Sequence, residues 1–357
     1  MTRSTVAVLF GGVSSEHEVS RLTAASVLEN IDRERWDPLA IGITREGRWF
    51  LCPEGLSPAS VADGSWEQDP GLRPAILSPD REHHGLWLFD GRAGWWRTRI
   101  DVIFPALHGK NGEDGAIQGL AQLAGIPLVG CGVAASALCM DKDLTKTLLT
   151  ARGIPNARWL TATREARDDE ALAGTIGKEL GWPVFVKPAS DGSSVGVSRV
   201  QGPKDLSAAL DTAFQSGRKV LIEEAVTGAE VECAVMGNHT GVETSSVLGE
   251  IVPKRALYDY EGKYLDGSTD LYLPARLPRE QSEAIKQAAI AAYRALECTG
   301  LARVDFFALA DGSYCLNEVN TLPGFTSISM WPKLMMASGM TYPELITRLI
   351  TLALEEG

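Results

Sequence analysis

The sequence predicts a protein of the α/β and α+β classes, with a parallel-sheet α/β unit at its N-terminus. Three observations support this. Strand and helix signals alternate over about the first third of the chain, which is typical of a parallel sheet covered by helices. From residue 139 the order changes to a smaller unit of strand, loop, helix and strand, and from about residue 231 long strands follow one another. Finally, 357 residues are too many for one ordinary core and suggest two or three domains.

The N-terminal unit begins with a β-branched apolar run at residues 5–10 that stops at two glycines. Residues 15–18 then have the form of a capping box, led by Ser15, and predict the start of a helix. The inward face of this helix is expected to carry Val19, Leu22, Val27 and Ile31. Further strands are predicted at 39–43, 100–107 and 126–129, with a helix after residue 113. Residues 53–80 are rich in Pro, Gly and Ser and are expected to form a surface loop, and the tryptophan-rich residues 94–96 give no prediction.

The middle and C-terminal segments are predicted in the same way. The middle segment is expected to contain helices at 141–151 and 203–214, strands at 183–187 and 219–223, and a glycine-serine loop to residue 196. Long strands around Ala234 and Val247 follow, then a polar loop through Asp270. The last elements are a helix at 280–296 with an apolar face, strands at 301–308 and 313–319, and a helix at 342–354.

Composition excludes several classes of protein. A formal net charge of −12 disfavours a broad basic surface for nucleic acid or an anionic membrane, so any anion site needs individually placed cations. The N-terminus has no apolar span near the roughly 20 residues of a membrane helix, and we expect a cytoplasmic protein. The six cysteines show no metal-ligand spacing, which indicates reduced structural thiols.

A candidate metal site lies on the two strands near the C-terminus. Arg303 and Asp305 alternate on one strand, and Glu318 and Asn320 on the next, so each pair shares a face. If these strands form a hairpin, two carboxylates and an amide oxygen converge, and such hard donors suit Mg²⁺ or Mn²⁺. An ordinary polar hairpin face would have the same pattern.

A candidate anion site lies in the middle segment. Lys187 ends a buried strand and precedes a loop rich in glycine and serine, where an ammonium and backbone N–H groups could bind phosphate. This is no Walker A loop, and a hairpin turn would explain its glycines equally well. Glu223, Glu224 and Glu230 follow the next strand and could accept hydrogen bonds from adenine or ribose, although solvated strand ends have the same composition.

Two residues of the N-terminal unit are also candidates. Glu16 lies in the first turn of the predicted helix, where a carboxylate is stabilised by the helix dipole whether or not it binds a ligand. The glycines before it do not match the G-x-G-x-x-G fingerprint, so the sequence rejects a dinucleotide-binding site and a dehydrogenase. His108, at a strand end, lies where α/β proteins place ligands, although a lone histidine is more often structural.

Taken together and in order, seven motifs resemble the D-alanine–D-alanine ligase family of ATP-grasp enzymes. They are GGVSSEHEVS, ALHGKNGEDG, MDK, VFVKPASDGSSVGVS, YDYEGKYL, RVDFF and NEVNTLPGFTSIS, and they span residues 11 to 329. The resemblance implies a three-domain ATP-grasp fold with domains at 1–138, 139–230 and 231–357. ATP would lie between the second and third domains, with the amino acids facing the first.

The resemblance also implies roles at the nucleotide. Lys142 and Lys187 would contact the phosphates of ATP, and two Mg²⁺ (or Mn²⁺) ions would be held by Asp305, Glu318 and Asn320. The other residues expected at the nucleotide are Glu223, Glu224, Ala225, Val226, Glu230, Lys263 and Asn317.

In the implied reaction, the carboxylate of one D-alanine attacks ATP to give an acyl phosphate, and the amine of a second D-alanine displaces phosphate. Arg303 and the Gly324 backbone N–H would stabilise the oxyanion of the second step. Glu16 would bind the first ammonium and be linked through Ser193 to Tyr264. The other residues expected at the substrates are His108, Ser329 and Met330, and residues 258–264 would close as a lid.

The resemblance favours an amine acceptor, because relatives that make D-alanyl-D-lactate often lack the tyrosine equivalent to Tyr264. The expected product is therefore D-alanyl-D-alanine for peptidoglycan synthesis, and the expected assembly is a homodimer. Two alternatives remain open: a ligase that joins D-alanine to D-serine or D-lactate, and a nucleotide-binding regulator without turnover.

Overall fold

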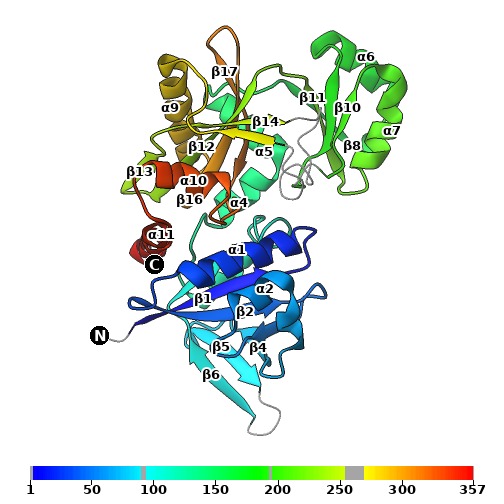
Figure 1. Cartoon of the computed structure of the whole chain (residues 1–357). Coiled ribbons are helices and arrows are strands. Elements are labelled where there is room, and N and C mark those ends of the chain that lie inside the picture. Colours follow the sequence, from blue (N-terminus) through cyan, green and yellow to red (C-terminus); the bar gives the residue numbers. More distant parts are fainter. Residues whose placement is uncertain (1–2, 90–93, 193–194, 254–268, 357) are drawn as a thin grey trace.

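The computed structural model describes residues 3–89, 94–192, 195–253 and 269–356, and it contains three β-sheets. In Figure 1 the largest sheet lies at the N-terminal end of the molecule, and the other two lie side by side at the opposite end. Each sheet is formed by a continuous part of the chain, so the fold class predicted from the sequence is confirmed.

The N-terminal sheet has seven strands in the order β6-β5-β4-β3-β2-β1-β7. The strands are β1 (Ser4–Gly11), β2 (Trp36–Ile43), β3 (Trp49–Leu51), β4 (Arg73–Leu77), β5 (Gly85–Phe89), β6 (Trp95–Arg99) and β7 (Val102–Pro105). β1 pairs in parallel with β2 and with β7, as predicted. The pairs from β2 to β6 are antiparallel, so the sheet is mixed and not wholly parallel.

The helices of this unit are α1 (His17–Asn30), α2 (Pro58–Asp63) and α3 (Ala116–Ala124). The predicted capping box is wrong: Ser14, not Ser15, accepts a hydrogen bond from the backbone of Glu16 (3.1 Å), and the helix starts at His17. Leu22, predicted to be buried, is 45% exposed because it faces a cleft. The predicted strand at 126–129 is reduced to a single bridge between Leu128 and Ile103.

Residues 53–80 were expected to form a loop, and this was wrong. They contain α2, a short 3-10 helix η1 (Ser65–Gln68) and β4. The side chain of Ser57 caps α2, whose first residue is a proline. Trp66 is fully buried and lies so close to Gly42 that a Cβ there would be 2.3 Å from the indole ring. Burial of this tryptophan fixes a segment whose composition is typical of loops.

The central sheet is small and antiparallel, in the order β10-β9-β11-β8. Its strands are β8 (Trp159–Thr163), β9 (Val184–Pro188), β10 (Ser198–Val200) and β11 (Lys219–Glu224). The helices of this region are α4 (Val133–Met140), α5 (Lys142–Ala151), η2 (Arg164–Ala166), α6 (Asp169–Glu179) and α7 (Pro203–Ala213). Asp141 caps α5 by accepting from two backbone N–H groups. The sequence did not predict α4, α6 or β8.

The C-terminal sheet has six strands, of which β15-β14-β12-β16-β17 form a continuous path and β13 pairs with β12. Its strands are β12 (Ala229–Asn238), β13 (Gly241–Thr244), β14 (Gly249–Pro253), β15 (Thr269–Tyr272), β16 (Gly300–Ala308) and β17 (Tyr314–Asn320). Its helices are α9 (Arg279–Ala295), α10 (Met330–Ala337) and α11 (Tyr342–Glu356). Two predictions are corrected: Val247 lies between strands, and Asp270 lies in β15 and not in a loop.

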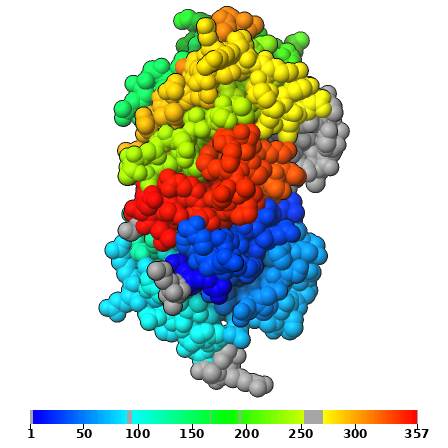
Figure 2. All heavy atoms as spheres, turned by 60° about the vertical axis from the view of Figure 1, so that its left-hand side comes forward, coloured from blue at the N-terminus to red at the C-terminus, as the bar shows by residue number. Residues whose placement is uncertain are grey.

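The cores of the three units differ in one respect. The central sheet has its own core under α6 and α7. By contrast, α10 and α11 share one continuous core with α1 and β1, and Trp331 and Leu345 pack in the same cluster as Phe10 and Val27. Figure 2 shows the C-terminal segment in red directly against the N-terminal segment in blue. None of the helices in the described part of the chain has the length and apolar character that crossing a membrane requires.

Candidate active site

A cleft of about 900 Å³ lies where the three units meet. This volume is near the upper end of the roughly 300–1,000 Å³ typical of small-molecule sites. Most residues predicted for the site line it, and they come from all three units. They are Glu16, His108, Lys142, Lys187, Glu223, Glu230, Arg303, Asp305, Asn317, Glu318, Asn320, Gly324, Ser329 and Met330.

Of the other predicted residues, some lie away from the cleft and the rest fall outside the described residues. The side chain of Glu224 points to Arg158 instead, and a carboxylate oxygen lies 2.7 Å from the guanidinium Nε. Ala225 and Val226 lie on the connection from β11 to β12 and are absent from the described cleft wall. Ser193, Lys263, Tyr264 and the predicted lid at 258–264 fall outside the described residues.

The hairpin of β16 and β17 brings together the polar side chains predicted to converge. Asp305 lies opposite Glu318, and Arg303 lies opposite Asn320. The carboxylate of Asp305 accepts hydrogen bonds from Arg303 Nε (2.8 Å) and Nη2 (2.7 Å) and from Asn320 Nδ2 (2.9 Å). No group of three or more His, Cys, Asp or Glu side chains in the described ranges has metal-binding geometry.

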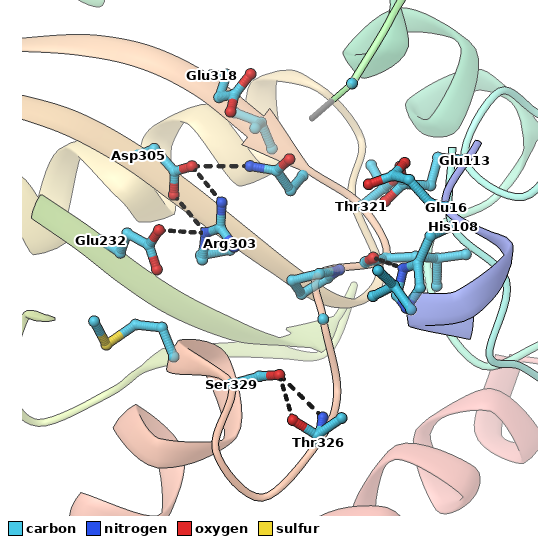
Figure 3. Close-up of a pocket in the computed structure, with 18 of the residues that line it drawn as sticks. Glu16, His108, Glu113, Glu232, Arg303, Asp305, Glu318, Thr321, Thr326 and Ser329 are labelled. Atoms are coloured by element: carbon cyan, nitrogen blue, oxygen red, sulfur yellow. Dashed lines mark hydrogen bonds and ion pairs between the residues drawn. The ribbon is translucent and has the colours of Figure 1, made fainter. Parts of the chain in front are cut away.

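Arg303 is the cation at the centre of this wall of the cleft (Figure 3). Its Nε also lies 3.2 Å from Oε1 of Glu232, a carboxylate on β12. Burial by itself would lower the pKa of the guanidinium, but Asp305 and Glu232 outweigh that effect and raise it well above its ordinary value. Arg303 is thus charged and is held on one edge by two carboxylates.

A group of lysines lies where the central sheet meets this hairpin. Lys142 Nζ donates to the Asp191 carbonyl (2.7 Å) and lies 4.0 Å from Glu318. Lys187 Nζ lies 2.9 Å from one oxygen of Glu223. Burial lowers the pKa of Lys142 despite the nearby Glu318 carboxylate. These are the individually placed cations that an anion site in an acidic protein requires.

Glu223 is held from behind by a second lysine. Lys146, which is 1% exposed, has its Nζ 2.6 Å from the other oxygen of Glu223. Burial would raise the pKa of Glu223, but Lys187 and Lys146 together lower it. The carboxylate of Glu223 therefore holds the ammonium of Lys187 in place. The sequence did not predict this pairing.

Acidic and imidazole groups form the wall facing Arg303, on the N-terminal unit. Figure 3 shows Glu16, Glu113 and His108 gathered there. The carboxylate of Glu16 is close enough to Gly109 that a Cβ at that glycine would lie 2.6 Å from its Oε2. A side chain at position 109 would displace Glu16, so the glycine is required for this approach.

His108 is buried and both of its ring nitrogens are engaged. The Leu322 carbonyl can only accept, so Nδ1 donates to it (2.9 Å), and Nε2 then accepts from the Thr23 hydroxyl (2.9 Å). Burial lowers the pKa of His108, although the Glu16 charge and the bond to Leu322 act in the opposite direction. His108 therefore joins α1 to the loop after β17 as a neutral imidazole.

Glu113 is a cleft residue to which the sequence assigned no role. Its Oε2 accepts from the backbone N–H of Gly109 (3.0 Å). Burial, followed by the charge of Glu16, raises the pKa of Glu113 to about 8. Glu113 thus carries a proton at neutral pH, next to the ionisable Glu16.

The raised pKa of Glu113 predicts a specific pH dependence of stability. Between the ordinary glutamate pKa of 4.5 and the raised pKa of about 8, the folded protein binds one proton more than the unfolded chain. Stability from this group is therefore fully present below pH 4.5 and is lost as the pH rises through 8. We expect the stability of wild type relative to Glu113→Gln to fall by on the order of a few kcal/mol across this window. Chemical denaturation at several pH values measures it.

Glu344→Gln is a suitable control for this prediction, because Glu344 is exposed and its hydrogen bonds to Thr341 lower its pKa. Its difference from wild type should stay constant over the same pH window. If the difference in stability between wild type and Glu113→Gln were also independent of pH over this window, Glu113 would already be ionised in the folded protein.

The loop between β17 and α10 supplies the last predicted residues. The Ser329 hydroxyl lies 2.8 Å from that of Thr326 and accepts from the Thr326 backbone N–H (3.1 Å). Met330 follows as the first residue of α10 and packs against Gly249, where a Cβ would be 2.4 Å from the methionine sulfur. This loop is therefore held in place at the cleft by its own contacts.

Three residues of the site were missed in the sequence: Glu113, Lys146 and Glu232. A signal existed for Lys146, which lies four residues after Lys142 and so on the same side of a helix. Glu113 belongs to the motif that begins at Ala106, but its burial is a tertiary effect. Glu232 alternates with Glu230 on β12, and its contact with Arg303 depends on pairing with a strand about 70 residues away.

Two family models match the chain. The model described as D-ala D-ala ligase N-terminus matches residues 5–131, and the one described as D-ala D-ala ligase C-terminus matches residues 148–351. Together they cover most of the chain, and of the predicted residues that line the cleft only Lys142 lies outside both matches.

Curated relatives match over nearly the full length. The chain is 47% identical to the D-alanine–D-alanine ligase of Caldicellulosiruptor bescii, over 100% of this chain and 96% of that protein. It is 46% identical to the D-alanine–D-alanine ligase of Geobacillus kaustophilus, over 99% of this chain and 95% of that protein.

Solved structures have the same fold. The VanG D-Ala:D-Ser ligase from Enterococcus faecalis superposes with a TM-score of 0.90 at 38% identity, covering 99% of this chain and 100% of that one. The D-alanine-D-alanine ligase from Coxiella burnetii superposes with a TM-score of 0.86 at 34% identity, covering 99% of this chain and 96% of that one.

Proposed function

Because the chain belongs to the D-alanine–D-alanine ligase family of ATP-grasp enzymes, and so joins two D-alanines with ATP, we propose that this one cleft performs both steps of the reaction. The product, D-alanyl-D-alanine, is a precursor of peptidoglycan. The observation that carries the proposal is that lysines, carboxylates and Arg303 from separate units line the same cavity.

ATP is proposed to lie between the central sheet and the β16–β17 hairpin. Lys142 and Lys187 would contact its phosphates, and Glu230 and Asn317 would lie beside the nucleotide. The side chain of Glu223 would act mainly by fixing Lys187, since both of its oxygens are engaged by lysines.

The donor set on the hairpin fits two Mg²⁺ (or Mn²⁺) ions. Asp305, Glu318 and Asn320 offer hard oxygen atoms, and Mg²⁺ is commonly held by one or two carboxylates together with substrate phosphates. When bound, the ions would neutralise charge on the transferring phosphoryl group.

In the first step, a carboxylate oxygen of the first D-alanine attacks the γ-phosphorus of ATP, the bond to the β-phosphate oxygen breaks, and ADP leaves. Glu16 is proposed to bind the ammonium of this D-alanine. Its position beside Gly109 on the cleft wall, opposite Arg303, supports this role.

In the second step, the amine nitrogen of the other D-alanine forms a bond to the acyl carbon and loses one proton, and phosphate leaves with the electron pair of the broken C–O bond. Arg303 and the Gly324 N–H are proposed to stabilise the oxyanion that forms. Ser329 and the Met330 backbone would bind the second carboxylate. Ser193 is proposed to link Glu16 to Tyr264. Lys263 is proposed to contact the nucleotide when residues 258–264 close over the site.

Several wider proposals follow from the family resemblance. The domains are proposed to run from 1–138, 139–230 and 231–357. The enzyme is proposed to act in the cytoplasm as a homodimer, without nucleic-acid or membrane partners, and the net charge of −12 supports the last point.

The acceptor is tested by measuring ADP and product together. With D-alanine as the only amino acid we expect one dipeptide per ADP, because both curated relatives described above, at 47% and 46% identity, are D-alanine–D-alanine ligases. D-Serine or D-lactate added in equal amount should appear in a minor share of the product. A main product with either of them would select the alternative ligases, and no ADP release at all would indicate a regulator.

A further inference from the structure

Glu232 belongs to a row of three carboxylates across neighbouring strands. In the sheet, Glu232 of β12 lies opposite Asp305 of β16, which lies opposite Glu318 of β17. All three line the cleft. Two of them are the proposed metal ligands, so the third needs an explanation of its own.

Two explanations are possible for Glu232: a further metal ligand, or a partner of Arg303. The side chain of Glu232 is 6% exposed, and its Oε1 lies 3.2 Å from Nε of Arg303, whose side chain is 17% exposed. A buried guanidinium and a buried carboxylate at this distance stabilise each other, and each would be costly to bury alone. The contact favours the second explanation.

Asp305 alone would not hold the Arg303 guanidinium in place throughout the reaction. Its two oxygens accept from Nε and Nη2, and one of them also accepts from Asn320. Under the proposed function the same oxygens bind a cation, and lone pairs given to a cation are withdrawn from the guanidinium. Glu232 is the carboxylate at Arg303 that lies outside the proposed ligand set.

We propose that Glu232 is a positioning residue that holds Arg303 at the acyl carbon during the second step. This rests on the proposed oxyanion role of Arg303. Glu232 itself touches neither substrate. With Arg303 misplaced, amine attack on the acyl phosphate slows, and water can attack the same carbon instead. That side reaction breaks the same C–O bond, releases phosphate and regenerates D-alanine, so ATP is consumed without dipeptide.

The experiment compares Glu232→Gln with wild type at saturating Mg²⁺ and ATP. ADP and dipeptide are measured under these conditions, and a separate titration gives the Mg²⁺ concentration at half-maximal rate. We expect dipeptide formation to fall roughly 10-fold, as for other partners that orient an active-site group. ADP release should fall less, so the ratio of ADP to dipeptide rises above one, while the Mg²⁺ requirement stays unchanged. Glu232→Asp, which keeps the charge on a shorter side chain, should restore part of the coupling.

Glu250→Gln is the matched control. Glu250 is also a buried glutamate of this sheet, 5% exposed, and it pairs with Arg276 through a hydrogen bond of 2.6 Å. It lies opposite Val231, so its side chain is on the other face of the sheet from Glu232. Glu250→Gln should lower the melting temperature about as much as Glu232→Gln does, but it should still give one dipeptide per ADP. The comparison therefore separates a loss of stability from a loss of positioning.

Three outcomes would overturn the proposal. A Glu232→Gln enzyme that keeps one dipeptide per ADP excludes positioning of Arg303. A raised Mg²⁺ requirement in that variant would instead make Glu232 a metal ligand. The third is an Arg303→Met enzyme that remains fast and coupled, which would refute the proposed function of Arg303 and with it the role of Glu232.

Discussion

Arg303→Met is expected to lower dipeptide formation by about 100- to 1000-fold, the usual cost of removing one oxyanion donor. The substitution leaves a side chain of similar length without charge or hydrogen-bond donors. The acyl phosphate should still form, because the lysines and the nucleotide wall are untouched. The variant should therefore release some ADP without dipeptide, and quenched-flow measurement of both products tests this.

Removing Arg303 also leaves Asp305 and Glu232 without their cation, so the stability of the variant needs a control. Arg276→Met removes an arginine that pairs with a buried glutamate of the same sheet outside the cleft. It should be destabilised yet turn over at nearly the wild-type rate. If Arg303→Met matched Arg276→Met in turnover, Arg303 would have no role in the chemistry.

Asp305→Asn should be the other severe variant. We expect turnover to fall by at least about 100-fold, because a bound metal supplies several kcal/mol of charge stabilisation and 1.4 kcal/mol corresponds to a factor of ten. The Mg²⁺ concentration at half-maximal rate should rise roughly tenfold or more. Titrating Mg²⁺ into the enzyme with ATP, by calorimetry and by rate, measures both effects.

The Mg²⁺ dependence distinguishes metal binding from an indirect effect through Arg303, with which Asp305 pairs at 2.7 Å. Asp311→Asn on the same hairpin is the control, since Asp311 is exposed and bonds only to Ser313 among the described residues. It should bind Mg²⁺ like wild type. An Asp305→Asn enzyme with an unchanged Mg²⁺ requirement would remove Asp305 from the proposed ligands.

The hairpin site was predictable from the sequence because it depends on local geometry. Two-residue alternation and a short turn suffice to bring these polar side chains to one hairpin, and both conditions can be read along one stretch of chain. The exact pairing of Asp305 with Glu318 depends in addition on a register shift between Asp305 and Phe306, which the sequence did not predict. Lys187 was predictable for a similar reason, since a buried strand leads directly to it. The helix-start lysine at position 142 gained meaning only from the full set of motifs.

The remaining parts of the site depend on distant segments that meet only after folding. The raised pKa of Glu113 arises because this side chain is desolvated in the cleft wall next to Glu16, and no local pattern predicts that position. Glu232 reaches Arg303 through a strand pairing across a long stretch of chain. Composition misled the prediction at residues 53–80, where one buried side chain, Trp66, outweighs many loop-forming residues.

The core shared by the two ends of the chain has a consequence for how this protein is made. Leu345, Ile346 and Leu349 of α11 fill the same cluster as Val27 and Leu28 of α1. The Ser26 hydroxyl also donates to that of Tyr342 (3.1 Å). A nascent chain that has only its first 138 residues outside the ribosome would expose this apolar face. The N-terminal unit can therefore complete its core only after α11 has been synthesised. A truncation before α11 would leave this unit prone to aggregate.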